Sequence, residues 1–141
     1  MKKKSARRNV SLNPSGLDQE SEFTLLLQLE DAWVADRLAG NSESTTQLVD
    51  IEYQGGNSAG VSQSRADFIK SAGSAVRALV RHAQSDRAIK FRDNIAISTG
   101  TATLYFDTGE HTYRYLRVYD KADGGWRLIA SQSTPKLMSS S

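Results

Sequence analysis

The sequence predicts an α+β domain in which N-terminal helices pack against an antiparallel β-sheet. Apolar residues recur every three or four positions up to about residue 73, which is typical of helices. Beyond residue 76 they alternate with polar ones in segments rich in Val, Ile, Thr, Tyr and Phe, which is typical of strands. Short turns join these later segments, and short connections require antiparallel neighbours. Helices followed by a meander of strands indicate an α+β domain.

The first element is a long amphipathic helix, expected over residues 17–39. Asp18, Glu20 and Glu22 lie in its first turn, where the positive end of the helix dipole favours acidic groups. Gly40 follows as a left-handed cap. One broad apolar face is formed by Phe23, Leu26, Leu29 and Trp33.

Shorter elements follow this helix. Ser42 is expected to cap a second helix that ends at residue 49, and a short strand is expected over 51–54. Ser64 and Asp67 have the spacing of a capping box in its acidic form, so they predict the start of a third helix.

The second half of the chain is expected to form a four-stranded meander. The strands cover residues 76–92, 95–106, 111–120 and 126–133. The turns between them are Asp93-Asn94, Asp107-Thr108-Gly109 and Asp123-Gly124-Gly125.

The charges are divided unevenly along the chain. Of the 18 Lys and Arg residues, five lie in the first 16 residues, which hold no acid, so the remainder has 13 basic against 16 acidic groups, a net charge of −3. We therefore expect a disordered basic tail over 1–16, one domain over 17–135 and a short tail over 136–141. A solvated leader is the favoured interpretation of the basic tail, and a polybasic arm for nucleic acid or anionic lipid is the alternative.

Several protein classes are excluded by composition. No cysteine is present, which excludes disulfides, thiolate metal sites and a Cys nucleophile. His82 and His111 are the only imidazoles and lack metal-binding spacing, so we expect neither a metal nor a cofactor. No segment is apolar enough to span a membrane, and we expect a soluble, cytoplasmic protein whose folded domain does not bind nucleic acid.

The order of motifs in residues 20–135 resembles the nuclear transport factor 2-like superfamily, in particular its SnoaL-like and calcium/calmodulin kinase association-domain branches. The similar segments are Glu30-Asp31-Ala32-Trp33, Asn94-Ile95-Ala96-Ile97, Arg117-Val118-Tyr119, Asp123-Gly124-Gly125 and Trp126-Arg127-Leu128-Ile129. The resemblance implies a cone: a strongly curved antiparallel sheet with helices closing its concave side around a pocket. It also implies a homodimer.

Strand alternation sorts the candidate pocket residues by face. Tyr113, Tyr115, Arg117 and Tyr119 share one face, and in the last strand Ser131 and Ser133 are expected opposite Trp126 and Leu128. By the resemblance, Arg117 points into the pocket with Tyr115, and Thr101 and Ser133 occupy positions of other pocket arginines. The pocket is therefore expected to hold one cation, whose guanidinium suits a ligand carboxylate.

Alternatives remain open for each candidate. Arg117 could instead pair with Asp31 or Glu30, or lie in a dimer interface, because a buried guanidinium needs a partner. Trp33 and Tyr53 could line the pocket or belong to the core, and Ser131 is a further candidate ligand contact.

A catalytic role depends on His82, the candidate general base, with an ordinary half-buried strand position as the alternative. Steroid isomerases of the superfamily place an Asp base near residues 53–57, where this sequence has no carboxylate, and only a shifted Asp50 or Glu52 could replace it.

The sequence thus favours a SnoaL-like protein that binds a small organic molecule, carboxylated or hydroxylated, and leaves open whether it catalyses an isomerase, cyclase or dehydratase reaction. The alternative is a homodimerising assembly module without catalytic activity.

Overall fold

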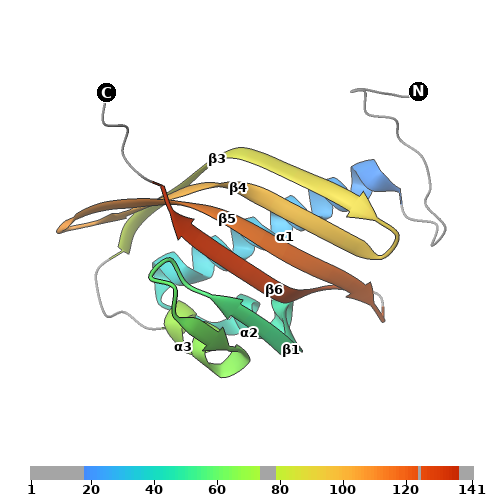
Figure 1. Cartoon of the computed structure of the whole chain (residues 1–141), viewed down its shortest axis with the longest axis horizontal. Helices are drawn as coiled ribbons and strands as arrows, with labels where there is room; N and C mark the ends of the chain where they lie inside the picture. The colour runs from blue at the N-terminus through green and yellow to red at the C-terminus, as the bar shows by residue number, and fades with distance from the viewer. Residues whose placement is uncertain (1–17, 74–78, 124, 137–141) are drawn as a thin grey trace.

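The computed structural model describes residues 18–73, 79–123 and 125–136 (Figure 1). The expected basic tail over 1–16, the expected C-terminal tail apart from residue 136, and the beginning of the strand expected from residue 76 lie outside these ranges. The elements are α1 (Gln19–Ala39), α2 (Glu43–Leu48), β1 (Val49–Gly56), β2 (Ser62–Ser64), α3 (Arg65–Gly73), β3 (Leu79–Arg92), β4 (Ile95–Phe106), β5 (Gly109–Ala122) and β6 (Gly125–Pro135). In the described ranges no helix has the length and apolar character needed to cross a membrane.

The ends of α1 are as the sequence predicts. The Asp18 carboxylate accepts a hydrogen bond from the backbone N–H of Glu20 at 3.2 Å, which satisfies one of the free donors of the first turn. Gly40 adopts φ 69°, and its N–H donates to the carbonyl of Arg37 at 3.2 Å. This left-handed cap ends the helix where the sequence indicates.

Of the caps expected for the two shorter helices, the one at α3 is confirmed and the side-chain cap at α2 was assigned to the wrong residue. Ser42 occupies the N-cap of α2 but makes no side-chain cap bond; the Asn41 side chain instead accepts from the N–H of Glu43 at 2.9 Å. At the start of α3 the reciprocal bonds of a capping box are present. The N–H of Ser64 donates to Asp67 Oδ2 at 3.1 Å, and the N–H of Asp67 donates to Ser64 Oγ at 3.2 Å.

Six strands form one sheet in the order β2-β1-β6-β5-β4-β3. The antiparallel meander from β3 to β6 is confirmed. The expectation of a wholly antiparallel sheet was wrong, because β1 pairs in parallel with β6 and the sheet is mixed. No tight turn joins these two strands, so the connection does not dictate their orientation. The three-residue β2 pairs with β1 and was not expected from the sequence.

A β-bulge in β6 changes which face its residues share. Val118 pairs with Ala130 and Tyr119 with Leu128, so Ile129 is the extra residue. The alternation expected for this strand was therefore wrong. Ser131 comes to the same side of the sheet as Leu128, because one extra residue reverses the phase of a period-two pattern.

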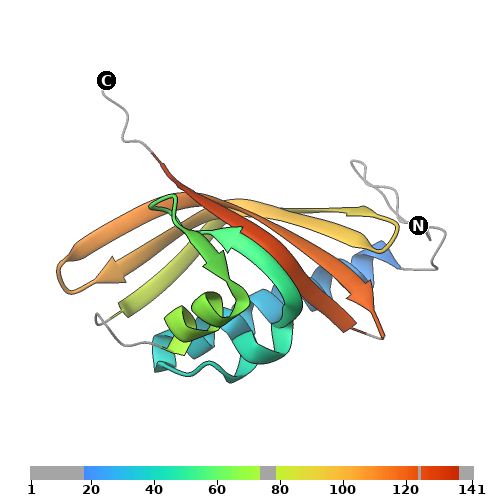
Figure 2. The same ribbon diagram turned by 60° about the horizontal axis from the view of Figure 1, so that its bottom comes forward.

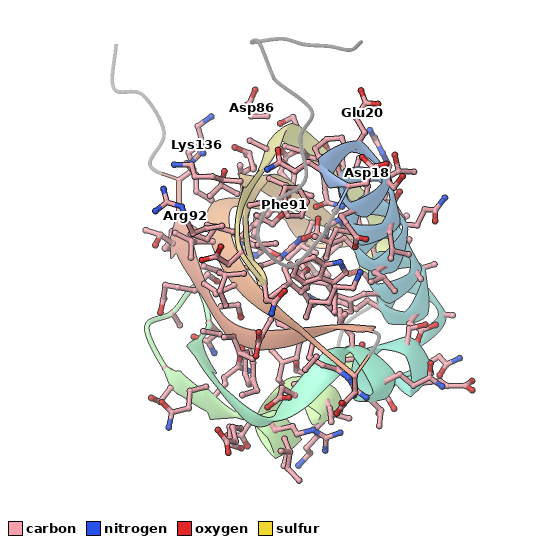
Figure 3. The ribbon with its side chains drawn as sticks, turned by 90° about the vertical axis from the view of Figure 1, so that its right-hand side faces the viewer. Asp18, Glu20, Asp86, Phe91, Arg92 and Lys136 are labelled. Carbon is pink, nitrogen blue, oxygen red and sulfur yellow. The ribbon has the colours of Figure 1, made fainter. Side chains whose placement is uncertain are left out.

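The helices cover one face of the sheet (Figure 2). Side chains fill the space between the sheet and α1, and Phe91 of β3 lies among them (Figure 3). The larger core cluster consists of Leu26, Trp33, Leu48, Val49, Tyr53, Ala96, Tyr119, Trp126 and Leu128. A smaller cluster of Ala102, Leu104, Tyr113 and Tyr115 lies toward the other end of β4 and β5.

Candidate functional site

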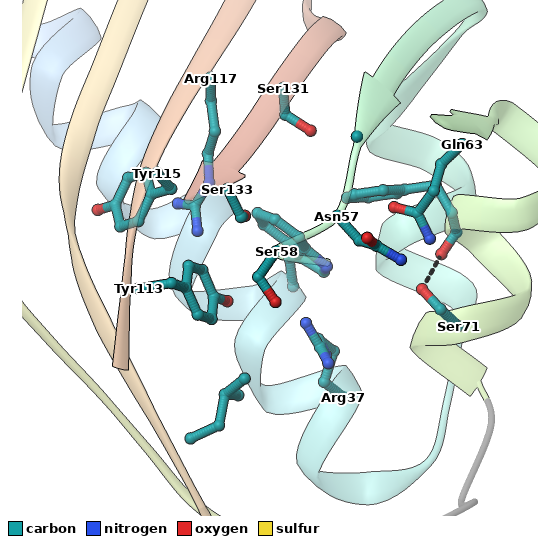
Figure 4. Close-up of a pocket in the computed structure, with 14 residues that line it drawn as sticks. Arg37, Asn57, Ser58, Gln63, Ser71, Tyr113, Tyr115, Arg117, Ser131 and Ser133 are labelled. Atoms are coloured by element: carbon teal, nitrogen blue, oxygen red, sulfur yellow. Dashed lines mark hydrogen bonds between the residues drawn. The ribbon is translucent and has the colours of Figure 1, made fainter. Parts of the chain in front are cut away.

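A cavity of about 210 Å³ lies between the helices and the sheet (Figure 4). Strands β5 and β6 form one side, and α1, α3 and the turn between β1 and β2 form the other. It is lined by Trp33, Arg37, Gly56, Asn57, Ser58, Gln63, Phe68, Ser71, Leu104, Tyr113, Tyr115, Arg117, Ser131 and Ser133. Trp33, Tyr115, Arg117, Ser131 and Ser133 are thus brought together as the sequence suggests.

Arg117 projects from β5 on the inner face that it shares with three tyrosines, all of which are buried. Arg117 itself is 2% exposed. The guanidinium carbon lies 3.6 Å from the ring centroid of Tyr115 and 4.4 Å from that of Trp33. The cation is therefore held between two aromatic faces, an arrangement that fixes the plane of its fork.

Arg117 also pairs with an internal acid, as one of the sequence alternatives proposed. Its Nη1 lies 3.1 Å from Oε2 of Glu30, a carboxylate that α1 carries into the interior with no exposed surface. The same oxygen accepts from the hydroxyl of Tyr119 at 2.7 Å. The other oxygen, Oε1, accepts from Nη2 of Arg87 at 3.1 Å. This set of bonds compensates the burial of the charges.

Both charges of this pair are maintained by their neighbours. Burial alone would raise the pKa of Glu30, but Arg117 together with hydrogen bonds from Tyr119, Ser98 and Arg87 lowers it below the ordinary value. Burial alone would lower the pKa of Arg117, and the Glu30 carboxylate raises it. Both groups are ionised at neutral pH.

Arg37 is a cavity residue that the sequence reasoning missed. It lies in the last turn of α1, one turn after Trp33, and is half-buried. Its guanidinium points into the space between α1 and the sheet (Figure 4). A spacing of four residues places two side chains on the same helix face, so the position of Trp33 was the available signal.

The cavity therefore holds two guanidiniums where one cation was expected. No Asp or Glu is among the described residues that line it. The remaining polar lining consists of hydroxyl and amide side chains. Such a surface attracts an anion, because guanidinium donors are present and the Glu30 carboxylate that pairs with Arg117 does not itself line the cavity.

Two glycines allow the aromatic rings to approach the backbone. A Cβ on Gly100 of β4 would lie 2.3 Å from the hydroxyl oxygen of Tyr115, so only glycine leaves room for that ring. A Cβ on Gly55 of β1 would lie 2.5 Å from the carbonyl oxygen of Ser131. Here Tyr53 and Ser131 share a hydrogen bond of 2.6 Å between their hydroxyls. Tyr53 is 3% exposed and borders a neighbouring groove rather than this cavity.

Thr101 and His82 lie away from the cavity. Thr101 accepts a hydrogen bond from Nη1 of Arg114 at 2.9 Å, and these paired residues occupy the opposite face of the sheet from Arg117. His82 lines a separate groove between β3 and α1 with Asp31, Val34, Ala35, Leu38, Gln84 and Arg87. Neither Asp50 nor Glu52 lines the cavity.

The environment of His82 makes it a weak base. Burial, followed by the positive charges of Arg37, Arg117 and Arg87, lowers its pKa from 6.5 to about 4. A general base works best with a pKa near the working pH, so at pH 7 the neutral imidazole of His82 binds a proton too weakly to be an effective base.

No protein-family model matches the chain, and no curated protein matches it. Several solved structures do share its fold. A nuclear transport factor 2-like protein from Cytophaga hutchinsonii has a TM-score of 0.74 at 21% identity, covering 85% of this chain and all of the other. A nuclear transport factor 2-like superfamily protein from Salmonella enterica has a TM-score of 0.69 at 13% identity, covering 85% and 94%. The CaMKII hub of S. rosetta has a TM-score of 0.65 at 23% identity, covering 79% and 94%.

The resemblance to this superfamily is thus confirmed at the level of the fold, although the sheet is mixed rather than wholly antiparallel. The chain has the nuclear transport factor 2-like superfamily fold, with association-domain-like hubs among its structural neighbours.

Proposed function

We propose that this protein binds a small organic anion, with a carboxylate as the recognised group, in the cavity between α1 and the curved sheet. The observation that carries the proposal is the cavity lining, which has two guanidiniums and no acid among the described residues. Arg37 and Arg117 approach from opposite sides, from a helix and from a strand. A carboxylate between them would accept hydrogen bonds from both.

The other lining residues suit the rest of such a molecule. Trp33, Phe68 and Leu104 supply apolar walls, and Tyr115 supplies a further aromatic surface. Ser131 and Ser133 supply hydroxyls near Arg117. The volume of about 210 Å³ fits a compact ligand of one ring and a few substituents.

The site supports binding of the ligand without a chemical reaction. The candidate base His82 lines another groove and has a lowered pKa, and no carboxylate lines the cavity among the described residues. Proton abstraction in the cavity would therefore need a base that the ligand or solvent supplies.

The test is a titration calorimetry comparison of 3-hydroxybenzoate with its neutral analogue 3-hydroxybenzamide. We expect the carboxylate to bind and the amide to bind at least about tenfold more weakly, because a charge-assisted hydrogen bond contributes about 1.5–3 kcal/mol. Arg37→Gln should remove this difference. Arg114→Gln is the matched control, since Arg114 lies on the outer face of β5. Equal binding of the two compounds would contradict the proposal.

A second candidate function is assembly into a homodimer through the outer face of the sheet. Leu116 is 45% exposed in the middle of this face, opposite Thr99 of β4 and Gln132 of β6. An exposed Leu whose neighbours on the two adjacent strands are uncharged suits contact with a second copy. The two functions are compatible, because the cavity and this surface lie on opposite faces.

A further inference from the structure

The two guanidiniums of the cavity differ in how much charge they offer a ligand. Nη1 of Arg117 lies 3.1 Å from the Glu30 carboxylate. Arg37 forms no side-chain hydrogen bond or ion pair with any residue in the described ranges. Arg37 therefore presents a full charge, whereas Arg117 presents N–H donors whose charge Glu30 balances.

The charged groups around Arg37 and Arg117 also leave one positive charge without a partner. Arg87 donates to Glu30 and also lies 3.0 Å from Asp31 Oδ1, so both acids of this part of α1 are occupied. Arg37, Arg87 and Arg117 thus face two carboxylates, which leaves one positive charge. The three cations are near enough together that each lowers the pKa of His82, an imidazole that stays neutral at pH 7 and adds no charge.

We propose that Glu30 sets the charge of the ligand, so that the cavity selects a hydroxylated monocarboxylate over a dicarboxylate. Arg37 supplies the balancing charge and Arg117 supplies oriented donors. This inference rests on the proposed function and specifies its ligand class. A second ionised carboxylate would enter a partly enclosed cavity with no free cation left for it and with Glu30 behind Arg117, and a charge withdrawn from water without a partner is costly.

The hydroxyl groups of the ligand are inferred from the far side of the cavity. Asn57, Ser58, Gln63 and Ser71 line that side with neutral hydrogen-bonding groups. Neutral donors and acceptors pair well with hydroxyls but do not balance a second anion. These four side chains carry no charge, whereas the two cations of the cavity come from α1 and β5.

The experiment measures the affinities of 3-hydroxybenzoate and 5-hydroxyisophthalate by titration calorimetry at pH 7.5. These probes share a ring and a hydroxyl and differ by one carboxylate. The protein is expected to bind the monocarboxylate about tenfold or more tightly than the dicarboxylate, since an unbalanced charge near Glu30 is disfavoured even at an effective dielectric constant of 20.

Glu30→Gln should reduce or reverse this ratio, again by about tenfold, because it frees the charge of Arg117. Glu22→Gln is the matched control: Glu22 also lies on α1 and is ion-paired, but its partners are Lys121 at 2.8 Å and Trp126 at 2.6 Å rather than an arginine of the cavity. Ser58→Lys provides a second variant if Glu30→Gln does not fold. Ser58 is an exposed position of the lining, so an added cation there should also shift preference toward the dicarboxylate.

The outcomes separate the two proposals. If the unmodified protein binds the dicarboxylate as well as or better than the monocarboxylate, or if a folded Glu30→Gln variant leaves the ratio unchanged, Glu30 does not set the ligand charge, although carboxylate binding stands. If neither probe binds above the level of 3-hydroxybenzamide, the proposed function itself fails and the inference fails with it.

Discussion

Glu30 is a fully buried carboxylate, and its partners determine whether that burial is tolerable. The sequence contained the signal for it, because Leu26, Glu30 and Trp33 recur at helical spacing and place an acid on an apolar face. The sequence did not decide between Glu30 and Asp31 as the partner of Arg117. Both lie near the same strands, and only the rotation of α1 about its axis places Glu30 inward and leaves the Asp31 side chain 62% exposed.

Replacing Arg117 by Met is expected to lower the free energy of unfolding by about 3 kcal/mol. The substitution leaves the buried charge of Glu30 with Arg87, Tyr119 and Ser98 but without Arg117, and an incompletely paired buried charge is strongly destabilising. Urea denaturation followed by tryptophan fluorescence measures the change. Arg114→Met, on the exposed face of the same strand, should change it by less than about 0.5 kcal/mol. A loss as small in Arg117→Met as in the control would show that the ion pair is not required.

His82 is expected to make the stability fall as the pH is lowered from 7 to 5. Its pKa in the folded protein is about 4 against 6.5 for an unperturbed imidazole, so the unfolded chain binds the proton first. The contribution of the neutral His82 to the free energy of unfolding is fully present above pH 6.5 and is lost as the pH falls toward 4. The loss is about 2 kcal/mol between pH 7 and 5. Denaturation curves at several pH values measure this loss.

His82→Gln should flatten that pH dependence, and His111→Gln should preserve it, since His111 is exposed at the start of β5. This range lies above the acidic range in which Glu30 takes up a proton. An unchanged slope in His82→Gln would rule out His82 as the titrating group.

At the scale of elements, local pattern predicted most of the sheet but not its long-range pairing. The period-two pattern of Tyr113, Tyr115, Arg117 and Tyr119 is a local property, and it correctly placed the face of β5. The bulge at Ile129 arises from pairing between β5 and β6 and carries no local signature. The parallel contact of β1 with β6 likewise depends on packing between distant segments.

The sequence predicted only part of the cavity, because the rest of its lining depends on packing between distant segments. Its strand residues follow from alternation and from the family resemblance, whereas Arg37 and the turn around Ser58 are brought to it by the docking of α1 and by the β1–β2 hairpin. An Arg in the last turn of a helix is usual as a partner for the helix dipole, so Arg37 alone did not indicate a site.

Gly100→Ala is expected to displace the Tyr115 ring from β4. The added Cβ would lie 2.3 Å from the hydroxyl oxygen and 2.6 Å from Cζ of Tyr115, closer than atoms can approach. We expect a loss of about 1–3 kcal/mol in the free energy of unfolding and weaker binding of 3-hydroxybenzoate, because the ring supports Arg117. Gly125→Ala is the control, since a Cβ there meets no atom within 4 Å. Equal stability of the two variants would contradict the assigned role of Gly100.

At the scale of the whole molecule, the outer face of the sheet is the surface through which we propose that two copies of the chain pair. If a second copy covers Leu116, the protein should be a dimer at micromolar concentration by light scattering, and Leu116→Glu should make it a monomer by placing a charge in an apolar contact. Val80→Glu is the control, because Val80 is 66% exposed on the edge strand β3. A monomeric unmodified protein would exclude the dimer at this concentration.

The central claim is that a carboxylate binds between Arg37 and Arg117, and a crystal structure of the protein with 3-hydroxybenzoate tests it most directly. We predict the carboxylate oxygens within hydrogen-bond distance of both guanidiniums, about 2.7–2.9 Å, with the ring between Trp33 and Leu104 and the Arg117–Glu30 pair retained. The compound bound elsewhere on the protein, or bound in the cavity with its carboxylate turned away from both arginines, would contradict the claim.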